Sequence, residues 1–326
     1  MEKIALYQVR NFGEKFTATF DFFKQSWKLL FRYALYVLLP LSLLQTVGMD
    51  EYYSNAFSAS VMGGAEADPV TLLSQMGATL GIVMLVSLVA TVFVFSLVYG
   101  MMKYYHEGGE LNNVSFKAYW KTAQGRGYGR VVVIMLLGLL LSVLACTVLG
   151  LLAYITPYSL ILTIPALIVF ALPLTLWPPI YLMEEETGAI EALRKSYRYG
   201  LKTWGSLFVL TLVMTLIVYT ASSILMVPGM IMILIKALVF PQMAGVGSVA
   251  YTFVTFIVMA AGMFLNWIAM LPYLIAFGFH YGSAAEQIDN VTAADGIAHF
   301  NEMGDNNEDE PELEPKRSEI DDFEEL

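Results

Sequence analysis

The sequence predicts an all-α, polytopic membrane protein with six transmembrane helices, and three observations support that prediction. Hydrophobic residues make up 57% of the 326 residues and charged residues only 14%, with a mean hydropathy of +0.63. The chain is therefore far more apolar than a water-soluble domain needs to be. Six of its runs are long and nearly free of charge, and lysine and arginine gather between alternate runs.

Each of the six runs is long enough to cross a bilayer as a helix. Hydrocarbon about 30 Å thick requires roughly 20 apolar residues. The runs contain no Asp or Glu, and Arg32, near the start of the first run, is their one basic residue. They comprise residues 29–48, 80–102, 131–155, 160–183, 205–227 and about 249–279.

The positions of the basic residues predict the orientation. Residues 49–76 and the turn 156–159 contain no Lys or Arg, and only Lys236 follows the fifth run. The positive-inside rule therefore places both termini in the cytoplasm, and the expected location is the bacterial inner (plasma) membrane. No apolar signal segment precedes the first run, so the first spanning helix is expected to serve as its own insertion signal. Fifteen of the eighteen basic residues lie before or at the start of run one, or after runs two and four: Lys3, Arg10, Lys15, Lys24, Lys28, Arg32, Lys103, Lys117, Lys121, Arg126, Arg130, Arg194, Lys195, Arg198 and Lys202.

Amphipathic segments on the cytoplasmic side are predicted before spanning helices 1, 3 and 5. In the first segment, five aromatic residues at helical spacing form one stripe, expected to face acyl chains or neighbouring helices. Lys15, Lys24 and Lys28 would then point toward the headgroups. A weaker version, "SFKAYWKTAQGRGYGR", precedes the third run. The stripe consists of Phe12, Phe16, Phe20, Phe23 and Trp27.

The third amphipathic segment, "EEETGAIEALRKSYRYGLKTW" at residues 184–204, has the clearest pattern. Its glutamates precede the expected helix and its basic residues lie toward the other end, as the helix dipole favours. We expect its aromatic and aliphatic positions to form the buried face. That face would consist of Ile190, Leu193, Tyr197, Leu201 and Trp204.

Two domains are expected. Residues 1–282 form the six-helix transmembrane domain, in which a threefold repeat of one surface helix and two spans is suspected at 1–102, 103–183 and 184–282. Residues 283–326 hold fifteen Asp and Glu against Lys316 and Arg317, a local charge of −13, which leaves +3 for the membrane part. This acidic tail is predicted to be disordered and can serve as an interaction site for a cytoplasmic protein.

Two kinds of binding residue are nominated. Basic side chains beside the membrane are candidates for contact with anionic lipid headgroups. Asn266, near the middle of the sixth run, is a weak candidate for substrate contact, with interhelical hydrogen bonding favoured over it. Prolines in the fourth and sixth runs kink helices and could line a cavity, although packing is the favoured explanation. The headgroup candidates are Arg126, Arg130, Arg194, Lys195, Arg198 and Lys202.

The sequence nominates no catalytic residue, metal site or cofactor, and no nucleic-acid partner. Cys146 is the single cysteine, so an intramolecular disulfide or a thiolate metal cluster is excluded. No serine, histidine and acid have usable spacing for nucleophilic catalysis. The remaining combinations for an embedded enzyme are His106 with Glu107, and Glu184 to Glu186 with His280. We therefore expect a protein that is not an enzyme.

The segment "EEETGAIEALRKSYRYGLKTWGSLF" also resembles a known family. An acidic, glycine-containing loop, then Ala-Leu-basic-x-Ser and a Trp-x-x-Leu-Phe entry into the next span resemble the bacterial glycerophosphoryl diester phosphodiesterase membrane-domain family and its uncharacterised six-helix relatives. "FTATFDFFKQSWKLLF" is similar to that family's opening helix, and the likeness covers about residues 10–282. The resemblance implies a membrane module without the catalytic domain to which it is sometimes fused.

Two functions are expected. The first is a non-enzymatic scaffold, anchor or regulatory module, indicated by the surface helices, the acidic tail and the lack of a catalytic set. The alternative is a transporter or lipid-handling protein with a polar cavity between spanning helices 4, 5 and 6, indicated by the prolines, Asn266 and the suspected repeat.

Overall fold

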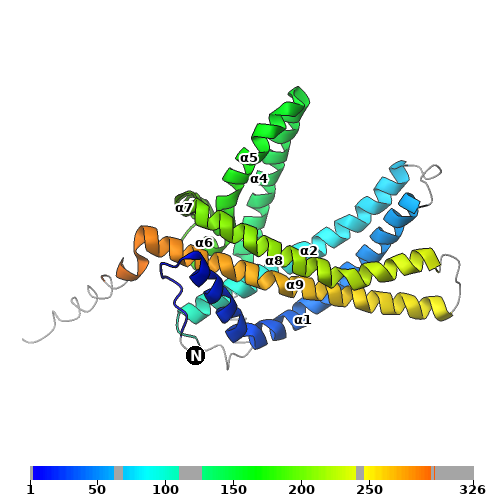
Figure 1. Cartoon of the computed structure of the whole chain (residues 1–326), viewed down its shortest axis with the longest axis horizontal. Helices are drawn as coiled ribbons and strands as arrows, with labels where there is room; N and C mark the ends of the chain where they lie inside the picture. Colours follow the sequence, from blue (N-terminus) through cyan, green and yellow to red (C-terminus); the bar gives the residue numbers. More distant parts are fainter. Residues whose placement is uncertain (1–2, 62–68, 110–126, 240–245, 295–296, 298–326) are drawn as a thin grey trace, which may run out of the picture.

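The computed structural model describes residues 3–61, 69–109, 127–239, 246–294 and 297, and every regular element in those ranges is helical. Figure 1 shows helices arranged as long antiparallel pairs. The helices are α1 (Phe12–Val61), α2 (Pro69–His106), α4 (Gly127–Ile155), α5 (Leu160–Ala171), α6 (Trp177–Met183), α7 (Ala189–Lys202), α8 (Trp204–Val239) and α9 (Val246–Asp289), with 3-10 turns η1 (Pro157–Ser159) and η2 (Leu172–Leu176).

The prediction of six membrane-spanning helices is confirmed. Among the described residues, six helical stretches are long and apolar enough to cross a bilayer. Each contains most of one predicted run and usually extends beyond it. The stretches are Phe12–Met49, Thr79–His106, Gly127–Ile155, Ile161–Met183, Trp204–Ile235 and Val249–Asp289. The protein is therefore a multi-pass integral membrane protein.

Three segments are more helical than expected. The amphipathic segment before the first span is continuous with that span in α1, which runs on through part of the predicted external loop to Val61. Similarly, α8 continues through Pro228 to Val239, well past residue 227, where the fifth predicted run ends. The close packing of α8 on α9 supports that continuation, because an added Cβ on Gly229 would lie 2.2 Å from Met259 Sδ. Finally, α9 continues past residue 282 to Asp289.

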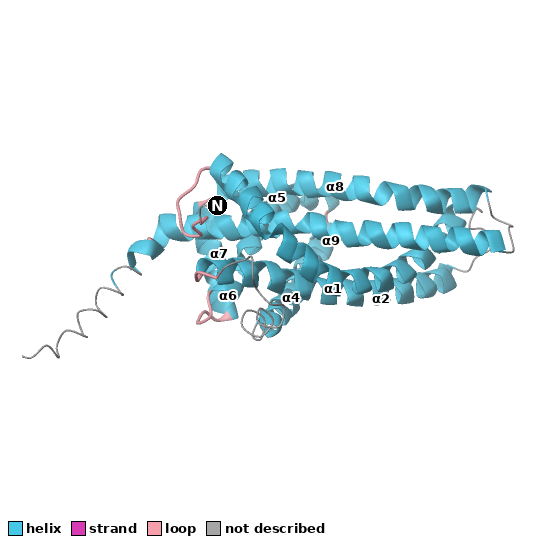
Figure 2. Ribbon diagram, turned by 90° about the horizontal axis from the view of Figure 1, so that it is seen from below, coloured by secondary structure: helices cyan, strands magenta, loops and turns pink. Residues whose placement is uncertain are grey.

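The helices converge at one end of the molecule, which we call the basal end. The starts of α1, α4, α7 and α8 lie there with the ends of α2, α6 and α9 (Figure 1). Within the main bundle the order is α8, α9, α1, α2, with neighbours in close contact (Figure 2). The α4–α5 hairpin projects away from this bundle, and its tip lies apart from the other two tips.

The hydrophobic core lies toward the basal end, where the hairpins meet. Its largest fully buried side chains come from α1, α2 and α9 and include Phe22, Tyr33, Tyr99, Phe277 and Tyr281. Residues from η2, α6 and α7 complete the same cluster. Helix α4 joins the core directly through Ile134 and its packing on α2, whereas α5 joins it through η2, the next element of the chain.

The aromatic stripe of α1 lies beside the buried face and not on it. Its phenylalanines are half-buried and Trp27 is exposed, and the rings pack on one another along the helix. The buried face includes Ala18, Phe22 and Lys15. Lys15 is only 4% exposed, so the expectation that it points toward headgroups was wrong, because α8 and α9 supply polar partners for its ammonium group.

Candidate functional site at the basal end

Helix α7 packs against the fourth span at the point where that span is interrupted. Prolines divide that span into α5, η2 and α6, and the turn of η2 packs against α7. The Tyr197 hydroxyl donates to the Phe170 carbonyl at 3.0 Å. An added Cβ on Gly200 would lie 2.7 Å from Pro173 Cα. The proline break therefore provides the surface on which α7 packs. Tyr197 donates a hydrogen bond to the Phe170 carbonyl at that break.

The buried face of α7 differs from the predicted one. Ile190 is 77% exposed and Leu201 is 50% exposed, whereas Ala192, Ser196 and Gly200 are buried. The prediction was wrong for Ile190 and Leu201, because it assigned large apolar side chains to the protein interior, whereas Leu193 and Trp204 do pack against the core. In a membrane protein, small residues allow helices to approach closely, while large apolar side chains can face lipid.

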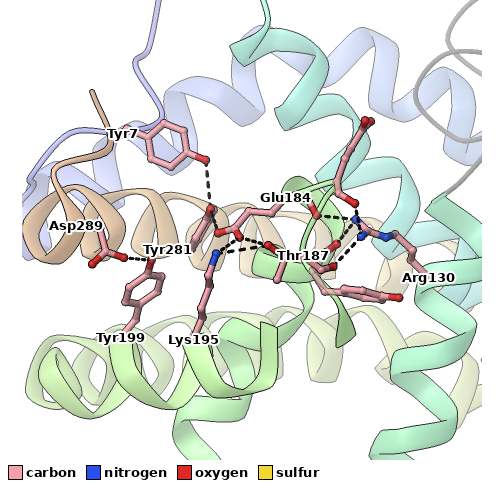
Figure 3. A network of polar contacts seen from close by, with 10 residues as sticks. Tyr7, Arg130, Glu184, Thr187, Lys195, Tyr199, Tyr281 and Asp289 are labelled. Atoms are coloured by element: carbon pink, nitrogen blue, oxygen red, sulfur yellow. Dashed lines mark hydrogen bonds and ion pairs between the residues drawn. The ribbon is translucent and has the colours of Figure 1, made fainter. Parts of the chain in front are cut away.

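The carboxylate of Glu184 is the centre of a polar network that joins four parts of the chain (Figure 3). Its Oε1 accepts a hydrogen bond from the Tyr281 hydroxyl at 2.8 Å. Its Oε2 accepts from the Thr187 hydroxyl and from Lys195 Nζ, both at 2.6 Å. The Tyr281 hydroxyl also lies 3.2 Å from that of Tyr7. The network thus ties the N-terminal segment and α9 to the loop before α7 and to α7 itself.

The side chain of Arg130, at the start of α4, binds backbone carbonyls in and next to the loop that contains Glu184. The guanidinium donates to the carbonyls of Tyr181 and Glu184, each at 2.7 Å, and to those of Glu185 at 2.6 Å and Thr187 at 2.8 Å. It also lies over the Tyr181 ring, 4.4 Å from the centroid. A planar group with five donors is suited to this role, and a lysine could not reproduce it. Arg130 therefore fixes the base of the α4–α5 hairpin to the loop (Figure 3).

The end of α9 is bound to α7 through one carboxylate. Asp289 accepts a hydrogen bond from the Tyr199 hydroxyl at 2.5 Å and forms an ion pair with Arg198. Burial raises the pKa of Tyr199 above its usual value, and the hydrogen bond to Asp289 and that carboxylate's charge act in the same direction. Tyr199 is therefore a stable hydrogen-bond donor at neutral pH.

The N-terminal segment crosses the ends of α2 and α9. The backbone of Leu6 lies against Gly282, whose added Cβ would be 2.3 Å from the Leu6 carbonyl oxygen. The backbone amide of Arg10 donates to Ser283 Oγ at 3.0 Å, and the Arg10 guanidinium donates hydrogen bonds to the Ala5 and Leu6 carbonyls. Burial lowers the pKa of Arg10, while Glu14 acts in the opposite direction. The segment is thus part of the packed basal end.

A second buried cluster joins α1, α8 and α9. Lys15 Nζ lies 3.1 Å from Ser206 Oγ and 3.3 Å from His280 Nδ1, and His280 Nε2 lies 3.0 Å from Thr203 Oγ1. An ammonium group only donates, so Nδ1 must accept and Nε2 must carry the proton. The Thr203 hydroxyl accepts that proton's hydrogen bond and donates to the Tyr199 carbonyl at 2.9 Å. The sequence carried no signal for this pairing, because the partners are far apart in the chain.

The nominated headgroup residues fall into three groups. Arg130 and Lys195 direct their donors to acceptors within the protein. Arg198 is half-exposed and paired with Asp289. Arg194 and Lys202 are exposed, and within the described part of the chain they have no hydrogen-bond or ion-pair partner. Arg126 lies outside the described residues. Contact with lipid stays a prediction for the whole set.

The buried amide inside the predicted bilayer is Gln45 and not the nominated Asn266. Asn266 is half-buried on α9. Gln45 Nε2 donates to Ser87 Oγ at 2.7 Å, and Gln45 Oε1 accepts from the indole N–H of Trp267 at 3.0 Å. These bonds join α1, α2 and α9. Gln45 lies within the first predicted run, and a search for polar residues in that run could have found it.

Within the described residues, His280 and Glu184, from one of the two combinations left for an embedded enzyme, bond to different partners, whereas His106 and Glu107 of the other combination are both exposed. His280 bonds to Lys15 and Thr203, while the neighbouring Tyr281 takes Glu184. A shallow hollow of about 390 Å³ lies near the start of α9, whereas His280 and Tyr281 lie near the end of that helix. Its lining is mainly apolar and consists of Val249, Thr252, Phe253 and Phe256. In the ranges that the structure describes, no three His, Cys, Asp or Glu side chains are grouped to hold a metal ion.

Comparisons of this chain with protein-family models, with curated proteins and with solved structures found no match. Functional conclusions therefore depend on the residues and their geometry.

Proposed function

We propose that this integral membrane protein is a non-enzymatic scaffold, anchor or regulatory module. The observation that supports this most strongly is the Glu184 carboxylate, whose two oxygens accept three hydrogen bonds from within the protein, from Tyr281, Thr187 and Lys195. A catalytic carboxylate needs access to a substrate and a free acceptor position. At the basal end the polar groups instead hold helices together.

The proposal includes an orientation in the inner membrane. The basal end carries the basic clusters that favour the cytoplasmic side, with both termini there. At the opposite end of the α4–α5 hairpin, Tyr154 is 90% exposed and Tyr158 is 82% exposed, as suits aromatic side chains at a membrane–water interface. The likeness to the glycerophosphoryl diester phosphodiesterase membrane domain belongs to the same proposal, since it implies a membrane module without its own hydrolase.

Co-purification from the native membrane, after mild cross-linking, tests the scaffold function. The full chain is compared with a chain ending at residue 297, which keeps the Asp289 contacts with α7. We expect cytoplasmic partners to be recovered with the full chain and lost with the shortened one, at equal thermal stability of the two proteins. Identical partner lists would remove the acidic tail from the proposed function.

A transporter or lipid-handling protein is the second candidate, favoured by the discontinuous fourth span, since broken helices form binding sites in many transporters. The hydrogen bond from Tyr197 to the Phe170 carbonyl instead supports a role for this break in packing α7. Thiol labelling discriminates the two. In a Cys146→Ser background, a cysteine at Asn266 would react with a membrane-impermeant reagent if a water-filled cavity exists. We expect no reaction there and full reaction at an exposed control in the loop before α7, Glu186→Cys.

A further inference from the structure

Helix α7 exposes a basic ridge, which consists of Arg194, Arg198 and Lys202. These residues are spaced four apart, so they lie on successive turns of one side and span about 12 Å. The outer two are exposed and have no hydrogen-bond or ion-pair partner among the described residues. The exposed side chains of Ile190 and Leu201 lie on the same side of the helix. The ridge therefore offers two unused charges with apolar surface along one flank.

The middle member of the ridge is already bound to an acid at the end of α9. Arg198 pairs with Asp289, and Tyr199 donates to the same carboxylate. Asp289 is the last residue of α9, so this helix ends beside the middle of the ridge, and Figure 3 shows the Asp289 carboxylate next to Tyr199. The following turn is held close by, because Glu286 accepts hydrogen bonds from the amide and hydroxyl of Thr292.

The segment after that turn has complementary chemistry. Residues 298–326 contain twelve Asp and Glu against Lys316 and Arg317, with apolar residues among the acids in "EIDDFEEL" at the end. The ridge combines basic and apolar side chains, and this segment combines acidic and apolar ones. Glu191, one turn before Lys195 on α7, is the nearest acid on the helix itself and lies at its N-terminal end, where the helix dipole favours it.

We propose that residues 298–326 dock on the basic ridge of the same chain, extending the Asp289–Arg198 contact to Arg194 and Lys202. Glu302, the first acid of the segment, lies thirteen residues after Asp289. Thirteen residues can span up to about 40 Å, whereas Arg194 and Lys202 each lie only about 6 Å along α7 from Arg198. The chain between Asp289 and the acidic segment keeps the acids near the ridge at an effective concentration in the millimolar range, although each exposed ion pair is weak by itself.

Docking of this segment would regulate the surface of α7. While the acids occupy the ridge, anionic lipid headgroups and acidic partners are excluded from Arg194 and Lys202. Release of the segment, for example by a basic partner that binds its acids, would expose the ridge. Screening by salt would weaken the contact, because the charges are exposed.

Zero-length carbodiimide cross-linking of the purified full chain in phosphatidylcholine nanodiscs tests the proposal. The reagent joins a lysine amine to a carboxylate that it contacts. We expect an intrachain link between Lys202 and residues 298–326 at low ionic strength, at a yield well above that of exposed Lys28 on α1. The Lys195–Glu184 pair, 2.6 Å apart, is the internal positive control.

Two changes sharpen the measurement. Arg194→Glu removes one attraction and adds a repulsion at an exposed position, so the Lys202 yield should fall roughly two- to fivefold while the control link stays constant. Salt at about 1 M should lower the same yield. Lys202 yields equal to those of Lys28, or links formed only between two chains, would overturn the proposal.

Lipid is the competing occupant. If no tail link forms, and if retention of phosphatidylglycerol by the protein depends on Arg194 and Lys202, the ridge binds lipid and the proposal is wrong. The purified chain contains no cytoplasmic partner, so either result leaves the scaffold function to be decided by the co-purification experiment.

Discussion

Helices α4 and α9 are both long and apolar enough to span a membrane, yet the protein buries them very differently. Within the most apolar window of each span, 44% of α9 residues are buried inside the molecule but only 11% of α4 residues. Glycines show the same contrast. An added Cβ on Gly262 or Gly278 of α9 would meet a neighbouring helix within 3.0 Å, whereas Gly138 and Gly150 of α4 face open space. Hydropathy therefore predicts insertion into the bilayer and says little about which helices pack together.

The basal end explains how a hairpin with so little packing keeps its place. Arg130 fixes the start of α4 to four carbonyls around α6, and α7 packs on η2 after α5. Polar contacts at the basal end thus supplement the limited packing of α4 on α2, whereas helix–helix packing holds α9 along its length. The contrast between the two regions can be measured by matched substitutions, with free energies of unfolding obtained from reversible unfolding in mixed detergent micelles.

Truncation of one leucine in each region should give the largest difference. Leu271 of α9 is fully buried, and Leu144 of α4 is largely exposed. Leu271→Ala leaves a cavity and should cost about 2–5 kcal/mol. Leu144→Ala should change the free energy of unfolding by no more than about 0.5 kcal/mol. Equal losses would mean that α4 packs as tightly as α9.

Removal of Arg130 should give the next largest effect. Arg130→Ala leaves four carbonyls without their donor and should cost at least about 2 kcal/mol. Arg130→Lys should not restore the loss, because an ammonium group lacks the planar fork. Arg194→Ala is the matched control at an exposed position and should cost less than about 0.5 kcal/mol. If Arg130→Ala were as mild as the control, the hairpin would have to be held by other contacts.

Glycine-to-alanine substitutions should have opposite signs at Gly200 of α7, in the packed basal end, and at Gly138 of the loosely packed α4. At Gly200 the new methyl group would meet the ring and backbone of Pro173, so the change should cost about 1–3 kcal/mol. At Gly138 nothing lies within 4 Å, so the change should stabilise α4 by up to about 1 kcal/mol. A stabilising Gly200→Ala would show that α7 does not pack closely on η2.

The smallest expected effect concerns the amides inside the bilayer. Gln45→Leu leaves the indole N–H of Trp267 without its acceptor and should cost about 0.6–1.7 kcal/mol. Asn266→Leu should cost less than Gln45→Leu, because Gln45 carries the hydrogen bonds between helices. The reverse order would make Asn266 the important polar residue of the bundle and would favour the alternative function.

Part of the fold and of the candidate site was predictable from local patterns. The six spans follow from the length and hydropathy of each run, and α7 follows from the periodicity of residues 189–202. The nominated basic residues of α7 are indeed those from which the ridge and the Glu184 network are built. Their partners were not predictable, because Tyr281 and Glu184 are 97 residues apart and Arg10 and Ser283 are 273 apart.

The sequence by itself determined that this chain enters a membrane six times, because transfer into hydrocarbon depends on the composition of each segment separately. It also determined that its basic residues gather between alternate spans. The tertiary structure alone decided that α9 is central and α4 peripheral, that Lys15 is buried, and that Ile190 and Leu201 of α7 face outward. Those outcomes depend on the shapes and pairings of residues that are distant in the chain, and in lipid the packing of small side chains decides which helices meet.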